Sequence, residues 1–269
     1  MPLADLADLA DQVCVVTGAS SGIGYQTAFD LAGEGARVCL VARRKERLEE
    51  LLQRMPGSGH SVAVTDVSKR DEVKALVTHV SDEYGRCDVL INNAGFSGER
   101  PLTEEGAVDD LKAMMDTNFY GTIYCTAEFL PMLIDSAPSN VVNVASMAGR
   151  LAIGGAPGYS ASKFAVVGFS EALYFQLRDK GVCVSVVEPG LIPTEGFPQT
   201  PVLSDPVMKY ALGSVEGVSK AIRSAISGRK MERVVPRWYY ALQIPRILAP
   251  PLYRLAQRKL VTPKQEDYL

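Results

Sequence analysis

The sequence predicts an α/β fold in which a parallel β-sheet is covered by helices on both faces. Short runs rich in β-branched residues alternate with longer stretches of helical periodicity, which is the order expected of a doubly wound sheet. Most of the short runs are apolar throughout, as in strands that are buried on both faces. The expected strands are 13–17, 37–41, 61–65, 88–92, 140–145 and 182–188, with a short edge strand at 232–236. The expected helices are 25–33, 45–55, 69–84, about 108–135 and 159–180.

Length and composition favour one globular domain. The chain has 269 residues, of which 47% are hydrophobic and 22% charged, and this is typical of a protein that buries its own core. We expect a single domain over residues 1–269, because no repeat, low-complexity tract or linker divides the chain. It begins with a lead-in of about 1–11 and ends with a helical tail of about 237–269. The proline-rich segment at about 191–213 is expected to be a substrate lid, with a disordered surface loop as the alternative.

Several features of the composition favour a cytoplasmic protein. The five cysteines are widely spaced, odd in number and without a C-x-x-C pair, as in a reducing compartment. The N-terminus carries acids where a signal peptide would carry basic residues, and arginines and prolines interrupt the apolar stretch 234–255. A net charge of −3 gives no indication of a nucleic-acid partner.

A glycine-rich turn joins the first expected strand to the first expected helix. Residues 18–24 read GASSGIG, a G-x-x-x-G-x-G spacing. Glycines let the backbone approach a phosphate, and the helix N-terminus adds free N–H groups and a positive dipole end. The alternative is a merely structural turn, which its place after the first strand of an α/β chain disfavours. The residues expected to bind the cofactor here are Gly18, Ser20, Ser21, Gly22, Ile23 and Gly24.

The second expected strand ends in Arg43 and Arg44. In dinucleotide-binding folds an acid at this position receives the ribose 2′-hydroxyl of NAD, whereas arginine pairs with a 2′-phosphate. Two arginines and no acid therefore predict NADP(H) over NAD(H). The alternative is that both arginines only form the solvated basic start of the next helix.

Two further strand ends carry polar or small residues. Asp66 and Val67 follow the third strand, and Asn92, Ala94 and Gly95 close the fourth. The carboxyl ends of parallel strands lie at one edge of the sheet, where such folds bind ligands. Asp66 is expected to accept a hydrogen bond from an adenine amine. Taken alone, the 92–95 run is better explained as a polar turn that ends the strand.

Tyr159 and Lys163 are spaced four residues apart at the start of an expected helix, so both lie on one helix face. A phenol with a pKa near 10 is a poor acid or base at neutral pH, and a nearby ammonium lowers that pKa. Alone, the pair is usually a surface feature. Ser146 adds weight, because it follows the fifth strand at the same sheet edge and is placed to donate to a carbonyl oxygen.

Together these residues resemble the short-chain dehydrogenase/reductase family, in its compact single-domain branch. The resemblance covers residues 13–194 and depends on the order and spacing of the glycine turn at 17–24, Asp66-Val67, Asn92 to Gly95, Asn118, Ser146, Tyr159, Lys163, Pro189-Gly190 and Thr194. It implies a Rossmann-type doubly wound sheet of seven parallel strands with a C-terminal helical extension. It also implies hydride transfer between NADP(H) and a ketone or secondary alcohol.

The resemblance assigns a role to each matching position. Tyr159 gives or takes the hydroxyl proton, Lys163 holds the nicotinamide ribose and lowers the Tyr159 pKa, and Ser146 orients the carbonyl. Asn118 supports a water that connects Lys163 to solvent. The remaining cofactor contacts come from Asn92 on the ribose side, from Tyr159, from Pro189-Gly190, and from Ile192 and Thr194 near the carboxamide and phosphates. The resemblance also implies a homodimer or homotetramer.

The substrate and the tail are less determined. Positions expected to face the substrate are largely apolar, with Arg150 the exception, which favours an uncharged, fairly hydrophobic carbonyl or alcohol. From Arg229 onward the charge is +6, against −9 for the rest. We expect this aromatic, basic tail to cover the pocket or a neighbouring subunit, with peripheral membrane contact as the alternative.

Other functions receive less support. The only histidines, His60 and His79, are expected on the surface away from the motifs, which disfavours a hydrolase triad or a histidine-ligated metal. A non-catalytic NADP-binding regulator would not need the complete set of Ser146, Tyr159 and Lys163. A sugar epimerase or dehydratase has a different glycine spacing and a longer substrate domain.

Overall fold

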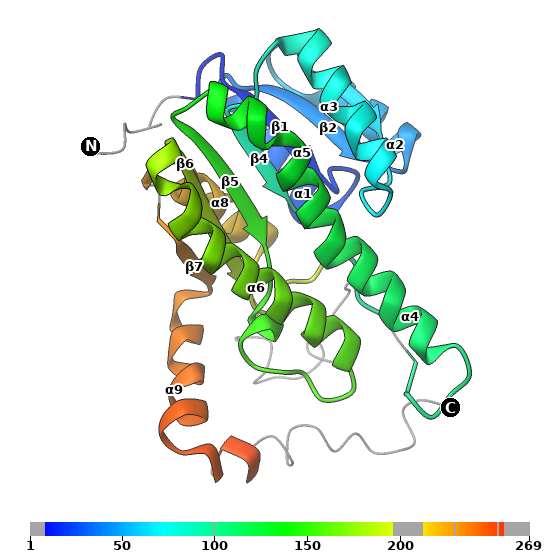
Figure 1. Cartoon of the computed structure of the whole chain (residues 1–269), viewed down its shortest axis with the longest axis vertical. Coiled ribbons are helices and arrows are strands. Elements are labelled where there is room, and N and C mark those ends of the chain that lie inside the picture. The colour runs from blue at the N-terminus through cyan, green and yellow to red at the C-terminus, as the bar shows by residue number, and fades with distance from the viewer. Residues whose placement is uncertain (1–8, 99, 196–211, 229, 252, 256–269) are drawn as a thin grey trace.

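The computed structural model describes residues 9–98, 100–195, 212–228, 230–251 and 253–255, and its centre is a parallel β-sheet (Figure 1). The sheet has seven strands in the order β3-β2-β1-β4-β5-β6-β7. All of its described pairings are parallel. The strands are β1 (Val13–Thr17), β2 (Arg37–Ala42), β3 (Ser61–Val64), β4 (Val89–Asn92), β5 (Ser139–Val144), β6 (Val182–Pro189) and β7 (Glu232–Val235). This confirms the predicted seven-stranded doubly wound sheet, with 232–235 as its edge strand.

Helices cover both faces of the sheet, because alternate residues of each central strand point to opposite sides. Cys14 and Val16 of β1 pack in one core with α1, α2 and α8. Val13 and Val15 pack in another with α3, α5 and α6. The helices are α1 (Gly22–Gly33), α2 (Lys45–Arg54), α3 (Arg70–Tyr84), α4 (Ala107–Met114), α5 (Gly121–Asp135), α6 (Pro157–Leu177), α8 (Val215–Gly228) and α9 (Tyr240–Leu248). Among the described residues, no helix is long and apolar enough to cross a membrane.

Two predicted helices differ from the structure in ways that concern the site. The stretch predicted as one helix over about 108–135 is α4, a π-helical segment η1 (Met115–Tyr120) and α5. A π-segment widens the helix locally and is frequent at functional sites, and this one contains Asn118. Helix α6 begins at Pro157, which suits the first helical turn, so Tyr159 lies inside that turn and does not open the helix.

The strand order brings the predicted motifs to one edge of the sheet. β1 lies between β2 and β4, so the chain crosses from one half of the sheet to the other between β3 and β4. In open α/β sheets, ligands bind at the carboxyl ends of the strands beside this switch point. The glycine turn follows β1 and the 92–95 run follows β4, so both flank it.

A buried carboxylate ties the amino ends of β1 and β4 together. Asp88 precedes β4, and its Oδ2 accepts from Val13 N at 2.8 Å and from Arg86 Nε at 3.0 Å. The backbone completes the link, because Asp88 N donates to Val13 O at 2.9 Å and Asp88 O accepts from Asn140 N at 2.8 Å. The acid thus holds three central strands in register.

Asp88→Ala should lower the free energy of unfolding by roughly 1–3 kcal/mol, because it leaves the buried Val13 N–H without an acceptor. Urea denaturation measures the change. The control is Asp71→Ala, which removes an exposed ion pair with Lys74 (3.1 Å) and should change stability by less than about 0.5 kcal/mol. Equal losses in the two variants would contradict this role of Asp88.

Candidate active site

The glycine turn after β1 packs directly against the end of β4. A Cβ on Gly24 would lie 2.3 Å from Gly18 O and 2.5 Å from Asn93 Nδ2, and one on Gly18 would lie 2.8 Å from the same amide nitrogen. Gly18 also has φ +68°, a conformation that favours glycine. Asn93 Nδ2 donates to Thr17 O at 3.0 Å. The backbone contact leaves no space for a side chain at either glycine.

Thr17 and Asn93 were not among the predicted site residues, yet they hold the turn in place. Thr17 Oγ1 accepts from Asn93 N at 2.9 Å and from Ala94 N at 3.0 Å, and donates to Ile91 O at 3.1 Å. The Ala94 N–H, predicted as part of the cofactor site, is therefore bonded within the protein. A threonine that closes a central strand beside a glycine turn was the available signal.

The segment after β6 lies over the start of α1. A Cβ on Gly22, which has φ +57°, would meet Thr194 Cβ and Cγ2 at 3.2 Å. Ser21 precedes α1 and its side chain makes no capping hydrogen bond to the helix. The N-terminus of α1 thus keeps N–H groups without a side-chain cap, which is the arrangement that binds phosphate. The predicted residues Gly22, Ser21 and Thr194 come together here.

Arg44 reaches from the end of β2 to the same turn. Its Nη2 donates to Ser21 Oγ at 2.8 Å and to Ser20 Oγ at 3.0 Å. Its Nη1 forms an ion pair with Glu195 Oε1 at 2.8 Å, and this hydrogen bond holds the pKa of Glu195 below its ordinary value. Arg43 is exposed and has no hydrogen bond or ion pair with the described residues. Arg44 and two serines of the turn therefore form one anion-binding cluster, with a carboxylate already on it.

The side chain of Asn92 turns away from the cofactor edge into the protein. Its side chain is buried, and Nδ2 donates to Asn143 Oδ1 at 2.8 Å and to Thr126 Oγ1 at 3.0 Å. The expected contact on the ribose side stays a prediction, and the side-chain amide belongs to a polar network between β4, β5 and α5. The physical reason is strand alternation, which turns position 92 toward α5. Asn143 Nδ2 continues the network to Ser170 Oγ at 2.9 Å.

Asp66 and Val67 lie where the third strand ends. Asp66 Oδ1 accepts from Ser68 N at 3.0 Å and from Ser68 Oγ at 2.7 Å, which shapes the loop before α3. Val67 is buried, and a Cβ on Gly121 would lie 2.8 Å from its Cγ2. The expected adenine contact of Asp66 stays a prediction.

The predicted serine, tyrosine and lysine meet at the carboxyl ends of β5 and β6. Ser146 follows β5, is buried, and accepts from Ala148 N at 3.1 Å. It also forms a hydrogen bond with Tyr159, one helical turn before Lys163 on α6. Lys163 Nζ lies 5.8 Å from the centre of the Tyr159 ring. Three residues from two separate segments thus form one constellation.

Burial is the main influence on the pKa values of Tyr159 and Lys163. For Tyr159 it acts in the opposite direction to the lowering expected from the Lys163 charge. Burial raises the pKa of Tyr159 above its ordinary value, and the hydrogen bond with Ser146 opposes that rise. Burial lowers the pKa of Lys163 to about 8. The ammonium donates to Val144 O at 3.0 Å, so its charge is directed to the end of β5. Burial dominates the pKa of Tyr159, and the lowering expected from Lys163 stays a prediction.

Asn118 links the loop after β4 to α6. Its Oδ1 accepts from Phe96 N at 2.9 Å, and its Nδ2 donates to Phe96 O and Ser162 Oγ, both at 3.0 Å. Ser162 Oγ in turn donates to Tyr159 O at 2.8 Å. The amide thereby fixes the backbone that carries the tyrosine. Its predicted support of a water near Lys163 stays a prediction.

The remaining predicted residues lie on the segment after β6. Pro189 O accepts from Ser146 Oγ at 3.4 Å, and Gly190 N donates to Val235 O at 2.7 Å. Ile192 is buried. Gly190 is covered by Tyr239, since a Cβ there would lie 2.0 Å from the ring. Within the predicted lid at about 191–213, residues 196–211 lie outside the described part of the chain.

Arg150 was expected among the residues that face the substrate, but its guanidinium is paired with three carboxylates. It donates from Nε to Glu188 Oε1 at 2.9 Å and pairs through Nη2 with Glu171 (2.7 Å) and Glu232 (3.3 Å). Glu188 is fully buried, and burial raises its pKa to about 7. This cluster joins the segment after Ser146 to the carboxyl end of β6 and to the start of β7. The sequence analysis did not predict it.

The two histidines are partly exposed and each has a structural partner. His60 Nδ1 accepts from Val38 N at 3.1 Å, and His79 Nε2 lies 3.0 Å from Ser61 Oγ. No group of histidine, cysteine or acidic residues in the described ranges is arranged to hold a metal ion.

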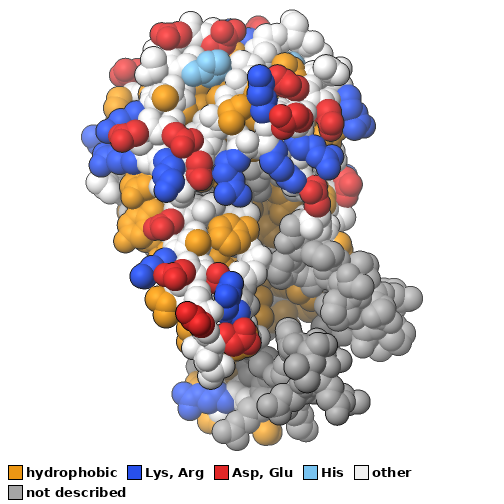
Figure 2. Space-filling view, turned by 90° about the vertical axis from the view of Figure 1, so that its right-hand side faces the viewer, with side chains coloured by type: hydrophobic (Ala, Val, Ile, Leu, Met, Phe, Trp, Pro, Cys, Tyr) orange, Lys and Arg blue, Asp and Glu red, His pale blue; other side chains and the backbone are white. Residues whose placement is uncertain are grey.

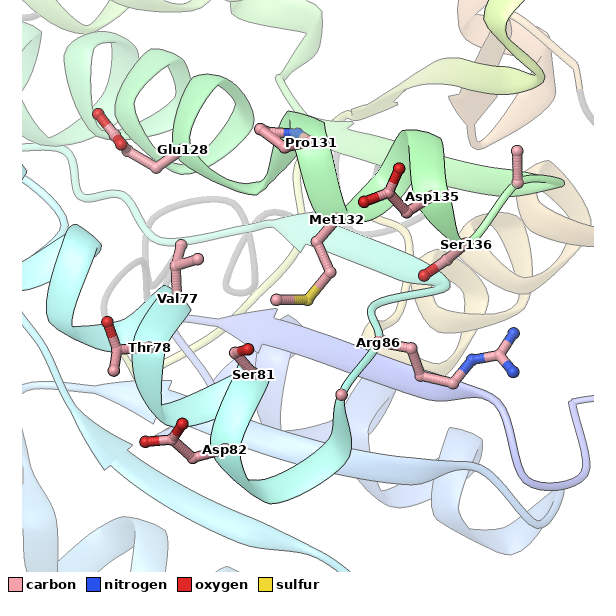
Figure 3. Close-up of a pocket in the computed structure, with 12 residues that line it drawn as sticks. Val77, Thr78, Ser81, Asp82, Arg86, Glu128, Pro131, Met132, Asp135 and Ser136 are labelled. Atoms are coloured by element: carbon pink, nitrogen blue, oxygen red, sulfur yellow. The ribbon is translucent and has the colours of Figure 1, made fainter.

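A groove of about 750 Å³ lies between α3 and α5, away from these motifs (Figure 3). Val77, Ser81 and Met132 project into it, while Arg86 and Ser136 lie at one end. It contains none of the predicted site residues and lies nearer the amino ends of the strands. It is therefore separate from the candidate active site.

The fold and the site define a nucleotide-binding α/β protein with a serine, a tyrosine and a lysine at the carboxyl edge of its sheet. Residues 12–201 match the family described as short chain dehydrogenase. The chain belongs to this family and is an oxidoreductase. Enzymes of the family use a nicotinamide cofactor, NAD or NADP.

Relatives and solved structures agree with this assignment. An uncharacterized oxidoreductase of Staphylococcus saprophyticus is 36% identical over 192 residues, which cover 70% of this chain and 82% of the relative. The 11-beta-hydroxysteroid dehydrogenase 1A of Arabidopsis thaliana is 33% identical over 268 residues, covering 94% of this chain and 76% of the relative. The structure of levodione reductase matches with a TM-score of 0.77 at 27% identity, covering 84% of this chain and 96% of that one.

Glu188 should make stability depend on pH. Its pKa is raised from the usual 4.5 to about 7, so the folded protein holds this proton more tightly than the unfolded chain. The stability it contributes is fully present below pH 4.5 and is lost as the pH rises through about 7. Compared with Glu188→Gln, which cannot titrate, the wild type should lose roughly 1–3 kcal/mol across this window. Urea denaturation of both proteins over this pH range measures it, and a constant difference would contradict the burial argument.

Proposed function

We propose that the protein is an NADP(H)-dependent oxidoreductase that interconverts a ketone and a secondary alcohol. The observation that carries the proposal is the group of Ser146, Tyr159 and Lys163 at the same sheet edge as the glycine turn and Arg44. A regulator of the same fold would need only the nucleotide half of this arrangement. We further propose a single domain over residues 1–269.

The residues present fit a dinucleotide with a 2′-phosphate. The turn at Gly18 and Gly24 has no space for side chains, and α1 begins without a side-chain cap. Arg44 bonds two serine hydroxyls and the Glu195 carboxylate. The guanidinium of arginine binds phosphate in the same way as it binds a carboxylate. Arg43 adds a second exposed cation. When bound, the nicotinamide supplies or accepts the hydride.

The chain's own residues would manage the proton and the orientation of the substrate. With its pKa above the ordinary value, Tyr159 is a neutral phenol at pH 7 and is suited to donate a proton to a carbonyl oxygen. Ser146 would hold the same oxygen by a hydrogen bond. Lys163 would remain the buried cation beside the phenol and bind the cofactor ribose, with Asn118 fixing the backbone of Tyr159.

An uncharged substrate is the class that the site favours. Arg150 is neutralised by three glutamates and so offers no cation to an anionic substrate. Met147 and Ala148, which follow Ser146, are buried and apolar. The relatives named for a hydroxysteroid and for levodione are consistent with a carbonyl or hydroxyl on an uncharged skeleton.

We also propose a homodimer or homotetramer that buries the aromatic surface of α5 and α6. Phe175 on α6 is 69% exposed and stacks edge-on with Tyr174. Tyr120 is exposed and stacks on Tyr124 of α5. An exposed aromatic surface of this kind is typical of protein interfaces.

Tyr159→Phe should lower kcat at least about 100-fold with ketone substrates, since it removes the proton that the mechanism requires. NADPH affinity, measured by fluorescence titration, should change little. Tyr174→Phe on the same helix is the matched control and should keep near-normal turnover. Retention of activity by Tyr159→Phe would refute the catalytic role.

Arg44→Ala should weaken NADPH binding by about tenfold or more and affect NADH much less, because only the former carries the 2′-phosphate. Glu195→Gln should strengthen NADPH binding, because it removes the carboxylate that competes for the Arg44 fork. Arg47→Ala, which loses only an exposed contact with Glu50 at 3.8 Å, is the control. Titration of both cofactors decides the matter, and tighter binding of NADH by the wild type would overturn the assignment.

A further inference from the structure

Helix α9 exposes apolar side chains where most surface helices expose polar ones. Ile244, Ile247 and Leu248 are 54%, 72% and 78% exposed, and no residue of the helix is fully buried. The side chain that turns partly inward is polar, Gln243. A helix with its apolar side toward solvent lacks the partner that would bury it.

Helix α9 contacts the body of the protein at its start and through Arg246. Tyr239, the residue before it, is buried against Gly190. Arg246 lies over the ring of Phe164 on α6, with its guanidinium carbon 5.0 Å from the ring centre. Figure 1 shows α9 below β7 and beside the lower part of α6, at the end of the molecule that carries the candidate active site. The contacts of Tyr239 and Arg246 therefore determine where the exposed face of α9 lies on the protein.

The charged side chains of this segment itself all have one sign. Between Arg237 and Leu255 the chain has three basic residues, Arg237, Arg246 and Arg254, and no acidic residue. All three arginines are exposed. On the face shown in Figure 2, by contrast, Lys and Arg lie interspersed with Asp and Glu. Apolar side chains with arginines beside them suit a surface that is anionic outside and apolar beneath.

We propose that α9 docks on an anionic lipid bilayer, lying in its interface with Ile244, Ile247 and Leu248 toward the acyl chains and the arginines toward the headgroups. Short amphipathic helices with basic and aromatic residues bind in this manner, and anionic lipid attracts each nearby arginine. A second copy of the chain would bring the same positive charge to the contact. Docking by α9 turns the active-site end toward the bilayer, and this follows whatever the substrate is.

The test is flotation of the full chain with lipid vesicles. Vesicles of phosphatidylcholine with phosphatidylglycerol should bind it at least about tenfold better than phosphatidylcholine alone, and added salt should weaken the binding. Arg237→Glu with Arg254→Glu should remove this preference, since loss of each charge costs about fivefold.

Apolar contact is tested separately by Ile244→Asp with Ile247→Asp, which should reduce binding to the anionic vesicles at least about tenfold. Val108→Asp is the matched control, because that side chain is 57% exposed but lies on α4, and it should leave binding unchanged. Circular dichroism melting curves verify that each variant is folded.

Absence of binding by the wild type, or equal binding by the Ile244 and Ile247 double variant, would overturn the proposal. Light scattering adds a second decisive outcome. A wild-type oligomer that does not bind vesicles and dissociates when Ile244 and Ile247 are replaced would identify α9 as a contact between copies of this chain.

Discussion

The candidate site depends on one close contact, the approach of the glycine turn after β1 to the end of β4. Thr17 accepts two backbone N–H groups from the residues after β4, and Asn93 returns a hydrogen bond to Thr17 O. A Cβ at Gly24 would fall within 2.3 Å of Gly18 O. Because the switch point of the sheet lies between these strands, this contact sets where α1 begins and therefore where a phosphate would bind.

The second determinant is the cost of burying charge beside the site. Burial moves the pKa values of both Lys163 and Glu188 closer to 7. It lowers the pKa of Lys163 to about 8 and raises that of Glu188 to about 7. Lys163 is held by a backbone carbonyl and Glu188 by Arg150. Perturbed groups of this kind concentrate at functional sites because a reaction needs groups that titrate near its working pH. The same burial raises the pKa of Tyr159 and so keeps it a neutral phenol at pH 7.

Sheet order and layers were predictable because strand runs and helical periodicity are local signals. The positions of the glycines, Arg44, Ser146, Tyr159 and Lys163 were predictable for a related reason, since the carboxyl ends of parallel strands must share an edge. The orientation of individual side chains was not. Asn92 stands in a motif beside the cofactor edge, yet strand alternation turns it inward to Thr126 and Asn143.

Side chains that depend on distant partners escaped prediction altogether. Arg150 is close to Ser146 in the sequence, but the direction of its side chain is decided by Glu171, Glu188 and Glu232 from three other elements. The π-segment around Asn118 is likewise set by tertiary bonds, since Asn118 spans the Phe96 loop and Ser162. No periodicity within 108–135 distinguishes it from ordinary helix.

The segment after β6 connects the two halves of the site. Pro189 O accepts from Ser146, Thr194 lies on Gly22, and Glu195 pairs with Arg44, all within seven residues of one strand end. An anion bound by the Arg44 fork would compete with Glu195, and Glu195 lies on the same segment as Thr194 and Pro189, which contact Gly22 and Ser146. The proposed phosphate and carbonyl sites therefore share one short stretch of backbone, residues 189–195, which contacts both the N-terminus of α1 and Ser146.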